Sequence, residues 1–311
     1  MGQFKFRLLI LILTSFIFLI KESYAIEKKT VGVILPSNVT YYEEIHTHFL
    51  KKMEANIVGG QIDFLIQKPF PDPVALSNAA RKLIAHNVDI IFCYGTEATI
   101  VTLKERPDQP VIYVAGYTPA LERYRTKNST GVEFKTPISS IPRYLNSMKE
   151  IKTLGVIYNP LESDSLYQLN EIMRCCPFYK MAVIKLVIKR PSDIRQVIED
   201  LNVDALIFTT SSIVNIALSA FREHSSNNMI PIATLLPRRE AKPTIALYPS
   251  AKKQAEKAAA IVQAILKGKK PHEIARDSSA DMELIFNIGE AQRMGLRISA
   301  DLLTEATEVI H

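Results

Sequence analysis

Three apolar segments of the sequence recur in the same order, at offsets of 123, 115 and 121 residues. The pairs are residues 30–36 and 153–159, residues 87–93 and 202–208, and residues 110–112 and 231–233. Each segment is a short apolar run that ends in polar or turn residues, which is typical of a buried strand in a parallel sheet. The repeat therefore predicts two similar lobes. A cleft between two such lobes is a usual place for a small ligand.

Turn residues and hydrophobic periodicity divide each repeat into strands and helices. In the first repeat we expect strands at residues 30–36, 61–67, 89–95, 110–116 and 130–134, and helices at about 41–54, 74–86 and 97–106. In the second we expect strands at residues 153–159, 181–188, 204–210, 230–236 and 244–248, and helices at about 165–174, 192–200 and 212–223. Strands that alternate with helices form parallel sheets with right-handed crossovers. The fold class is therefore α/β, with two Rossmann-like lobes.

The segments outside the repeats are predicted from capping patterns. Thr136 and Pro137 resemble a helix start, with Thr as the cap and Pro at the first helical position. A helix at about 251–267 is expected to end at Gly268. The tail contains a short strand near 284–286, a helix at about 289–294 and a last helix from about 300.

The first 25 residues have the pattern of a secretory signal peptide. Lys5 and Arg7 precede thirteen uncharged residues, Leu8 to Ile20, and Ser23-Tyr24-Ala25 precedes a cleavage site after Ala25. The apolar run is shorter than the ~18 residues that indicate a membrane span, and an uncleaved anchor is the alternative. We therefore expect an exported, periplasmic protein.

The charge balance does not favour a nucleic-acid partner. The chain has 38 Lys and Arg against 32 Asp and Glu, and residues 26–311 have 35 against 31. This excess is small, whereas nucleic-acid binding requires a clustered basic surface. The predicted export of the protein also argues against a DNA-binding function.

No metal, cofactor or catalytic motif is expected. Cys175 and Cys176 are adjacent, which fits disulfide geometry poorly, and with Cys93 they are predicted to be packed thiols without zinc spacing. His46 and His48 are two residues apart in a predicted helix, so they point to different sides. Glycine-rich phosphate loops and the Gly-x-Ser-x-Gly nucleophile turn do not occur, which argues against an enzyme.

Candidate ligand-binding residues follow the predicted strands. Ligands of parallel α/β sheets bind at the carboxyl ends of the strands. Many positions there start helices, where free backbone N–H groups favour an anion, although small polar residues at such positions also serve simply as helix caps. The candidates are Ser37, Asn38, Thr96, Glu97, Tyr117, Asn159, Asp164, Ser165, Thr210, Ser211 and Arg238.

Four segments together resemble one known family. They are Gly95-Thr96 with Ala98; Asn128 to Val132; Leu154 to Pro160 followed by Glu162 and Ser165; and Ile265 to Pro271 with Leu284 to Asn287, Ala291, Gly295-Leu296 and Ile298. In this order they resemble the ABC-transporter substrate-binding proteins of the tryptophan/tyrosine-binding type, which have the type I periplasmic-binding-protein fold. The resemblance runs from about residue 30 to about residue 310.

The resemblance implies a division into lobes and a set of partners. After a signal peptide at residues 1–25, residues 26–134 with 249–280 would form the N-terminal lobe, and residues 135–248 with 281–311 the C-terminal lobe. The ligand would close the hinge, and the closed monomer would dock on a membrane permease. A periplasmic sensor that signals ligand occupancy to a membrane receptor is the alternative function.

The expected pocket departs from the family pattern. The chain has Asp164 where the family often has Asn, and Thr210-Ser211-Ser212 where the family has Thr-Asp-Asn, so the carboxylate suited to a ligand ammonium is lost. Asp164 or Glu97 could replace this acid, whereas Arg238 or Arg239 would favour an anionic ligand. The ligand is left open between an amino acid and a small anion.

Overall fold

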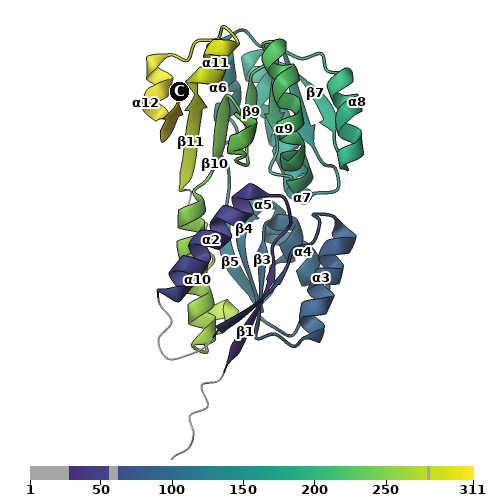
Figure 1. The fold of residues 1–311 in the computed structure, drawn as a ribbon, viewed down its shortest axis with the longest axis vertical. Coiled ribbons are helices and arrows are strands. Elements are labelled where there is room, and N and C mark those ends of the chain that lie inside the picture. Colours follow the sequence, from purple (N-terminus) through teal and green to yellow (C-terminus); the bar gives the residue numbers. More distant parts are fainter. Residues whose placement is uncertain (1–27, 56–61, 279–280) are drawn as a thin grey trace, which may run out of the picture.

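The two copies of the repeat form two separate sheets with the same order of strands. The computed structural model describes residues 28–55, 62–278 and 281–311. Within these residues the two α/β lobes lie end to end (Figure 1). The α/β fold class with two lobes is therefore confirmed, while the signal peptide and its cleavage site lie outside the described residues.

The first lobe is built on a parallel sheet. The strand order is β2-β1-β3-β4-β5. The strands are β1 (Lys29–Ile34), β2 (Ile62–Gln67), β3 (Ile90–Tyr94), β4 (Val111–Tyr117) and β5 (Ser129–Phe134). Its helices are α2 (Thr40–Glu54), α3 (Pro73–Ala85), α4 (Thr96–Lys104), α5 (Thr118–Leu121) and the 3₁₀ turn η1 (Glu122–Tyr124).

The second lobe repeats this arrangement and extends it. Its strand order is β12-β11-β10-β9-β8-β6-β7, in which β10 and β11 are antiparallel and the other pairs are parallel. The strands are β6 (Thr153–Tyr158), β7 (Ala182–Val187), β8 (Ala205–Phe208), β9 (Ile232–Thr234), β10 (Ile245–Pro249), β11 (Met282–Asn287) and β12 (Glu308–Ile310). The α-helices after β5 are α6 (Ser140–Met148), α7 (Ser163–Cys175), α8 (Ile194–Glu199), α9 (Ser212–Asn227), α10 (Ala251–Leu266), α11 (Ile288–Arg293) and α12 (Ala300–Glu305). The 3₁₀ turns are η2 (Cys176–Tyr179), η3 (Pro191–Asp193), η4 (Arg239–Ala241) and η5 (Pro271–Glu273).

The repeated Asn-Val-Asp sequence makes the same hydrogen bond in both lobes. Asp89 Oδ2 accepts from the N–H of Thr30 at 2.8 Å, and Asp204 Oδ2 accepts from the N–H of Thr153 at 2.8 Å. In each lobe this bond joins the start of the first strand to the start of its neighbour. The sequence repeat is thus a structural repeat.

The chain passes between the lobes three times. It leaves the first sheet after β5, returns after β10 through α10, and enters the second sheet again at β11. Helix α10 lies beside α2 in the first lobe (Figure 1), where Ala255, Ala258 and Ala259 are fully buried. These small side chains let α10 approach α2 closely, so the first core contains residues from a segment far away in the sequence.

The predicted helix start at Thr136 and Pro137 is wrong. Helix α6 begins at Ser140, and Thr136 and Pro137 belong to a turn in which the Pro137 carbonyl accepts from Ser140 N at 3.2 Å. This turn places Ile138 in the core of the second lobe before the helix begins. Burial of an apolar side chain here outweighs the local capping signal.

Two other element boundaries also differ from the sequence prediction. The strand expected at 230–236 is confined to β9, because Thr234 Oγ1 donates to the Leu236 carbonyl at 2.7 Å and turns the chain. The helix expected at 192–200 starts as the 3₁₀ turn η3 and continues as the short α8.

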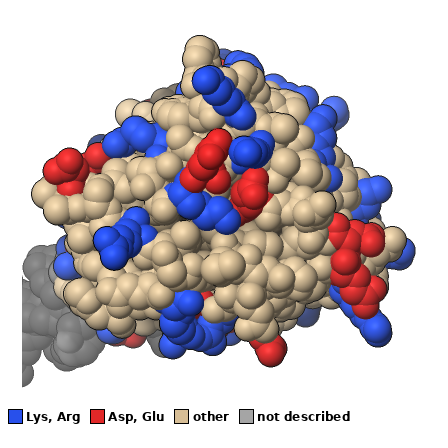
Figure 2. Space-filling view, turned by 90° about the horizontal axis from the view of Figure 1, so that it is seen from above, with Lys and Arg blue, Asp and Glu red and all other residues tan. Residues whose placement is uncertain are grey.

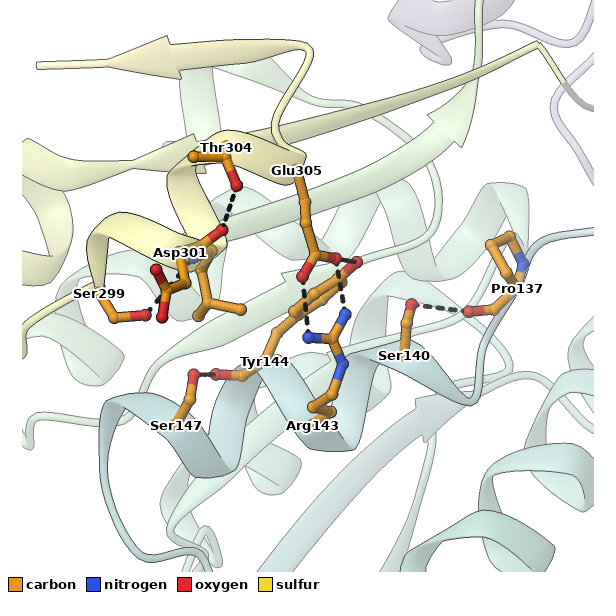
Figure 3. A network of polar contacts seen from close by, with 10 residues as sticks. Pro137, Ser140, Arg143, Tyr144, Ser147, Ser299, Asp301, Thr304 and Glu305 are labelled. Atoms are coloured by element: carbon orange, nitrogen blue, oxygen red, sulfur yellow. Dashed lines mark hydrogen bonds and ion pairs between the residues drawn. The ribbon is translucent and has the colours of Figure 1, made fainter.

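The C-terminal helix is held by an ion pair that sequence patterns do not indicate. Arg143 of α6 donates to both carboxylate oxygens of Glu305 at 2.9 and 2.6 Å, and Tyr144 Oη donates to the same carboxylate at 3.0 Å (Figure 3). The Tyr144 ring also packs edge-on against Phe286 of β11. These contacts hold α12 against α6. The residues after α12 pair with β11 as β12, a strand absent from the sequence prediction.

The end of the second lobe carries both signs of charge. Lys and Arg are interspersed with Asp and Glu on the face seen in Figure 2, without a continuous basic surface on that face. Within the described residues, every helix is too short or too polar to cross a bilayer.

Candidate functional site

The carboxyl ends of the two sheets face each other, and the lobes touch there directly. Helix α5 of the first lobe meets α7 of the second (Figure 1). Glu97 Oε1, from the first turn of α4, accepts from the backbone N–H of Ser163 at 2.6 Å. At another point of the contact, the Asn38 carbonyl accepts from Arg238 Nη1 at 3.1 Å. Groups from the two repeats therefore bond to each other directly where the lobes meet.

Tyr42 of α2 lies against the loop that carries Thr96 and Glu97. A Cβ atom on Gly95 would lie 2.3 Å from Tyr42 Oη, and Gly95 has φ +84°. Glycine is therefore required for both the backbone conformation and the approach of the tyrosine. The Tyr42 hydroxyl faces Ser212 at the start of α9, and burial, followed by the charge of Asp164, raises its pKa above the usual range.

Glu162 joins the loop after β6 to the start of α9. Its Oε1 accepts from Asn159 Nδ2 at 2.8 Å and from Ser211 Oγ at 2.6 Å, and its Oε2 accepts from the Ser212 N–H at 3.1 Å. Glu162 is 7% exposed. Its buried carboxylate accepts hydrogen bonds from groups at the start of α9 that have no partner within the helix.

Asp164 lies at the start of α7, where both lobes contribute hydrogen bonds. Its Oδ2 accepts from Thr210 Oγ1 at 3.0 Å, and its Oδ1 accepts from the Ser165 N–H at 2.7 Å. The Thr96 side chain, from the first lobe, also hydrogen-bonds to it. The Thr96 hydroxyl in turn accepts from the Tyr117 N–H at 3.0 Å, so Asp164 is connected to the end of β4.

A second layer of hydrogen bonds fixes the loops of the second lobe. Gln168 bonds twice to Thr210, with 2.8 Å for each bond. Ser165 Oγ accepts from the Asn159 N–H at 2.9 Å and lies 2.7 Å from Thr209 Oγ1. The loops after β6 and β8 are therefore one connected unit.

Three carboxyl groups at the contact between the lobes, the half-buried Glu97 and the buried Glu162 and Asp164, hold their protons more tightly than usual. Burial, reinforced by the charge of Asp164, raises the pKa of Glu97 to about 7 and that of Glu162 to about 8. Burial also raises the pKa of Asp164, against the hydrogen bond from Thr210. Raised carboxyl pKa values in a cleft are a feature of functional sites, since a low dielectric disfavours the charged form.

The structure brings most of the predicted site residues together. The connected set contains Thr96, Glu97, Tyr117, Asn159, Asp164, Ser165, Thr210 and Ser211. The other three lie apart from it. Ser37 donates its N–H to Pro69 O at 2.8 Å, Asn38 is exposed with φ 63°, and Arg238 makes an ion pair with Glu240 at 3.1 Å.

The list of candidate residues omitted four residues of the site. Tyr42 lies in the first turn of a predicted helix, and no local pattern shows that it reaches the contact between the lobes. Glu162 lies within the segment that carries the family resemblance, which was a usable signal. Gln168 was placed within a helix, and only its contacts show that it faces the loops. Ser212 was placed at a helix start after a strand, where its N–H bonds to Glu162.

Other hollows lie away from these residues. One, of about 520 Å³, is at the amino ends of the first sheet and is lined by Lys29, Asp89, Pro110 and Asn128 among others. Another, of about 820 Å³, runs along β7 and α8. The described residues contain no group of three or more His, Cys, Asp and Glu that could hold a metal ion.

Comparisons with known proteins agree with this arrangement. Residues 53–310 match the family model described as ABC transporter substrate binding protein. A tyrosine-binding protein of Clostridioides difficile (strain R20291) is 21% identical over 294 residues, which cover 90% of this chain and 85% of the relative.

Solved structures of similar fold include one with a bound amino acid. A Streptococcus pneumonia ABC domain in complex with L-Trp superposes with a TM-score of 0.84 at 18% identity, covering 91% of this chain and 100% of that chain. The ligand-free, open structure of a substrate-binding protein with adhesive properties from Clostridium difficile gives a TM-score of 0.62 at 19% identity, covering 91% of this chain and 99% of that chain.

Proposed function

Because the chain belongs to the ABC transporter substrate-binding protein family, we propose that it is the exported component of an importer and captures a small ligand that carries an amino group in the cleft between its lobes. The members of this family bind solutes and are not enzymes, so the chain is a binding protein. Family membership favours delivery to a transporter over the alternative of a sensor.

The hydrogen bond from Ser163 N to Glu97 Oε1 is the observation that carries the proposal. It joins two residues 66 positions apart, one in each repeat, at the carboxyl edge where parallel α/β sheets bind ligands. The lobes are thus in contact through polar side chains.

The proposed division into lobes is supported by the two separate sheets. We propose that residues 26–134 with 249–280 and residues 135–248 with 281–311 move as two bodies, and that the junctions after β5, after β10 and before β11 are the hinge. The signal peptide at residues 1–25 would direct the monomer to the periplasm, where a permease in the membrane would receive the closed form.

Thermal unfolding in the presence of candidate ligands tests the proposal. Protein purified from the full-length gene would be heated with amino acids, amines, dicarboxylates and inorganic anions. A ligand at 100 times its Kd stabilises the native state by about 2.7 kcal/mol, which raises Tm by roughly 5 °C. We expect such a shift with at least one compound that carries an amino group.

Two isosteric variants localise the effect. Asp164→Asn removes the buried charge at the start of α7 and should reduce the shift, whereas Asp200→Asn changes an exposed residue at the end of α8 and should preserve it. A chain that none of the compounds stabilises would contradict the proposed function. An equal loss in both variants would place the ligand outside the cleft.

A further inference from the structure

The acids at the contact between the lobes are not matched by buried bases. Glu97 comes from the first lobe, and Glu162 and Asp164 come from the second; the charge of Asp164 raises the pKa of both glutamates, and the charge of Glu97 raises the pKa of Glu162. The bases that act on this region, Lys104 and Arg174, are both exposed. A ligand that enters here therefore meets an excess of negative charge.

The remaining titratable groups around these acids add no positive charge. Tyr42 faces them from α2, Tyr117 from the end of β4 and Glu171 from α7, while α9 contributes the hydroxyl of Ser212. Arg238 is farther along the cleft, where it pairs with Glu240 and donates to the Asn38 carbonyl. The groups packed around the cluster are therefore acidic or neutral, apart from the exposed Lys104 and Arg174.

The positions suited to a ligand carboxylate are already occupied by the chain itself. Free N–H groups at helix N-termini are the usual partners of bound carboxylates. Here Glu97 accepts a hydrogen bond from the Ser163 N–H at the start of α7 at 2.6 Å. Glu162 accepts one from the Ser212 N–H at the start of α9 at 3.1 Å. A ligand carboxylate would have to displace a side chain of the same charge.

Two buried polar atoms at the same edge have no hydrogen-bond partner among the described residues. They are Tyr117 Oη and Asn215 Oδ1, on side chains that are 0% and 1% exposed. The charge of Glu171 acts most strongly on the Tyr117 hydroxyl and that of Asp164 next, so this hydroxyl lies between Glu171 of α7 and the acidic cluster. Both atoms can accept a hydrogen bond, which an ammonium group can donate.

We propose that the cleft binds an organic primary amine that lacks an α-carboxylate, and that Glu97 and Asp164 select this amine over the corresponding amino acid. The inference rests on the proposed function and adds the chemical class of the ligand. An organic ammonium fits better than a metal ion, since the described residues hold no metal-binding group of three or more His, Cys, Asp and Glu.

Binding of the amine would displace protons from the carboxyl groups of Glu97 and Glu162. At neutral pH the ligand-free cluster is partly protonated, because burial raises the pKa of Glu97 to about 7 and that of Glu162 to about 8. A cation favours the ionised carboxylates, so binding releases protons and the affinity increases with pH until both groups are ionised. An alkylammonium stays charged throughout this range, since it resembles a lysine side chain.

Matched pairs of ligands test the inference. Isothermal titration of the protein purified from its full-length gene would compare tyramine with tyrosine, tryptamine with tryptophan, and putrescine with ornithine. We expect at least one amine to bind roughly tenfold or more tightly than its amino acid. We also expect its affinity to increase between about pH 6 and about pH 9, with proton release that differs in heat between phosphate and Tris buffers.

A pair of variants separates charge at the cleft from charge elsewhere on α4. Glu97→Gln should weaken amine binding by roughly tenfold or more and flatten its pH dependence. Glu105→Gln removes the same charge at the opposite end of α4, where Glu105 pairs with Arg81, and should preserve both. Circular dichroism of each variant would establish that it is folded.

The outcomes distinguish this inference from the proposed function. Tighter binding of an amino acid than of its amine would overturn the amine preference and leave the function intact. Binding of small anions alone, or of Mg²⁺ or Ca²⁺ in place of amines, would also overturn it. If the protein binds none of the compounds, the proposed function fails as well.

Discussion

Replacing Gly95 with alanine tests how closely the first lobe packs at the cleft. Gly95 connects β3 to α4, with φ 84° and ψ 170°. An added Cβ would lie 2.3 Å from Tyr42 Oη and 2.6 Å from Tyr42 Cζ. The Tyr42 ring cannot move away freely, because it packs against Tyr41 and Tyr94 with centroid distances of 5.9 and 6.5 Å.

Two costs add in this variant. The backbone conformation is one that glycine adopts almost exclusively, and a side chain there costs about 1–3 kcal/mol. Overpacking against a buried ring costs about 1–3 kcal/mol more. We therefore expect Gly95→Ala to lower the free energy of unfolding by about 2–6 kcal/mol, a large fraction of the 5–15 kcal/mol typical of a domain.

Urea unfolding followed by circular dichroism measures this loss, with Gly268→Ala as the matched control. Gly268 also has a positive φ, +94°, and lies in the same lobe, but a Cβ there meets no atom within 4 Å. The control carries only a backbone cost of about 1 kcal/mol. Shortening the tyrosine with Tyr42→Leu should return part of the loss caused by Gly95→Ala. Equal losses in the two glycine variants, unchanged by Tyr42→Leu, would refute the reasoning.

Three further predictions concern other parts of the chain. Partial burial opposes ionisation of Asp204, but hydrogen bonds from the start of β6 outweigh it and lower the pKa of Asp204. Asp204→Asn should therefore lower the free energy of unfolding by about 1 kcal/mol above pH ~4, and by less as the pH falls. Urea titrations at several pH values would measure this loss. Arg143→Ala should cost up to about 1 kcal/mol, since Arg143 and Glu305 are 44% and 39% exposed, and the loss should shrink in high salt. Cys175 should react with a thiol reagent before Cys93 in the native protein, because Cys93 is fully buried and burial raises its thiol pKa to about 12.

Each of these has its own control. An unchanged pH profile in Asp204→Asn would mean that the repeated strand-start hydrogen bond does not stabilise the fold. Glu305→Gln should behave like Arg143→Ala if the pair acts as one unit, and a large loss in either would contradict a solvent-screened pair. Unfolding in urea should make Cys93 and Cys175 react alike, and equal rates in the native protein would show that the first core opens readily.

The sequence by itself determined the two α/β lobes and the succession of strands and helices along each repeat, and it predicted the carboxyl edge of the strands as the place of the candidate site. Repeated apolar runs define strands through local periodicity, and in parallel α/β sheets the carboxyl ends of strands mark the ligand edge. Thr96, Glu97, Asp164 and Thr210 could be named on this basis, because each follows directly after a strand or begins a helix.

Only the tertiary structure decided which of these residues meet. The bond between Glu97 and Ser163 depends on how one lobe rests on the other, and no local pattern encodes that. Tyr42 enters the site because the turn at Gly95 leaves room for its ring, which is a property of packing between two elements. The turn at Thr136 departs from the local signals for the same reason, since burial of Ile138 in the second core outweighs helix-capping preference. Periodicity is a property of neighbouring residues, whereas the acidic contact between the lobes arises from distant ones brought together by the fold.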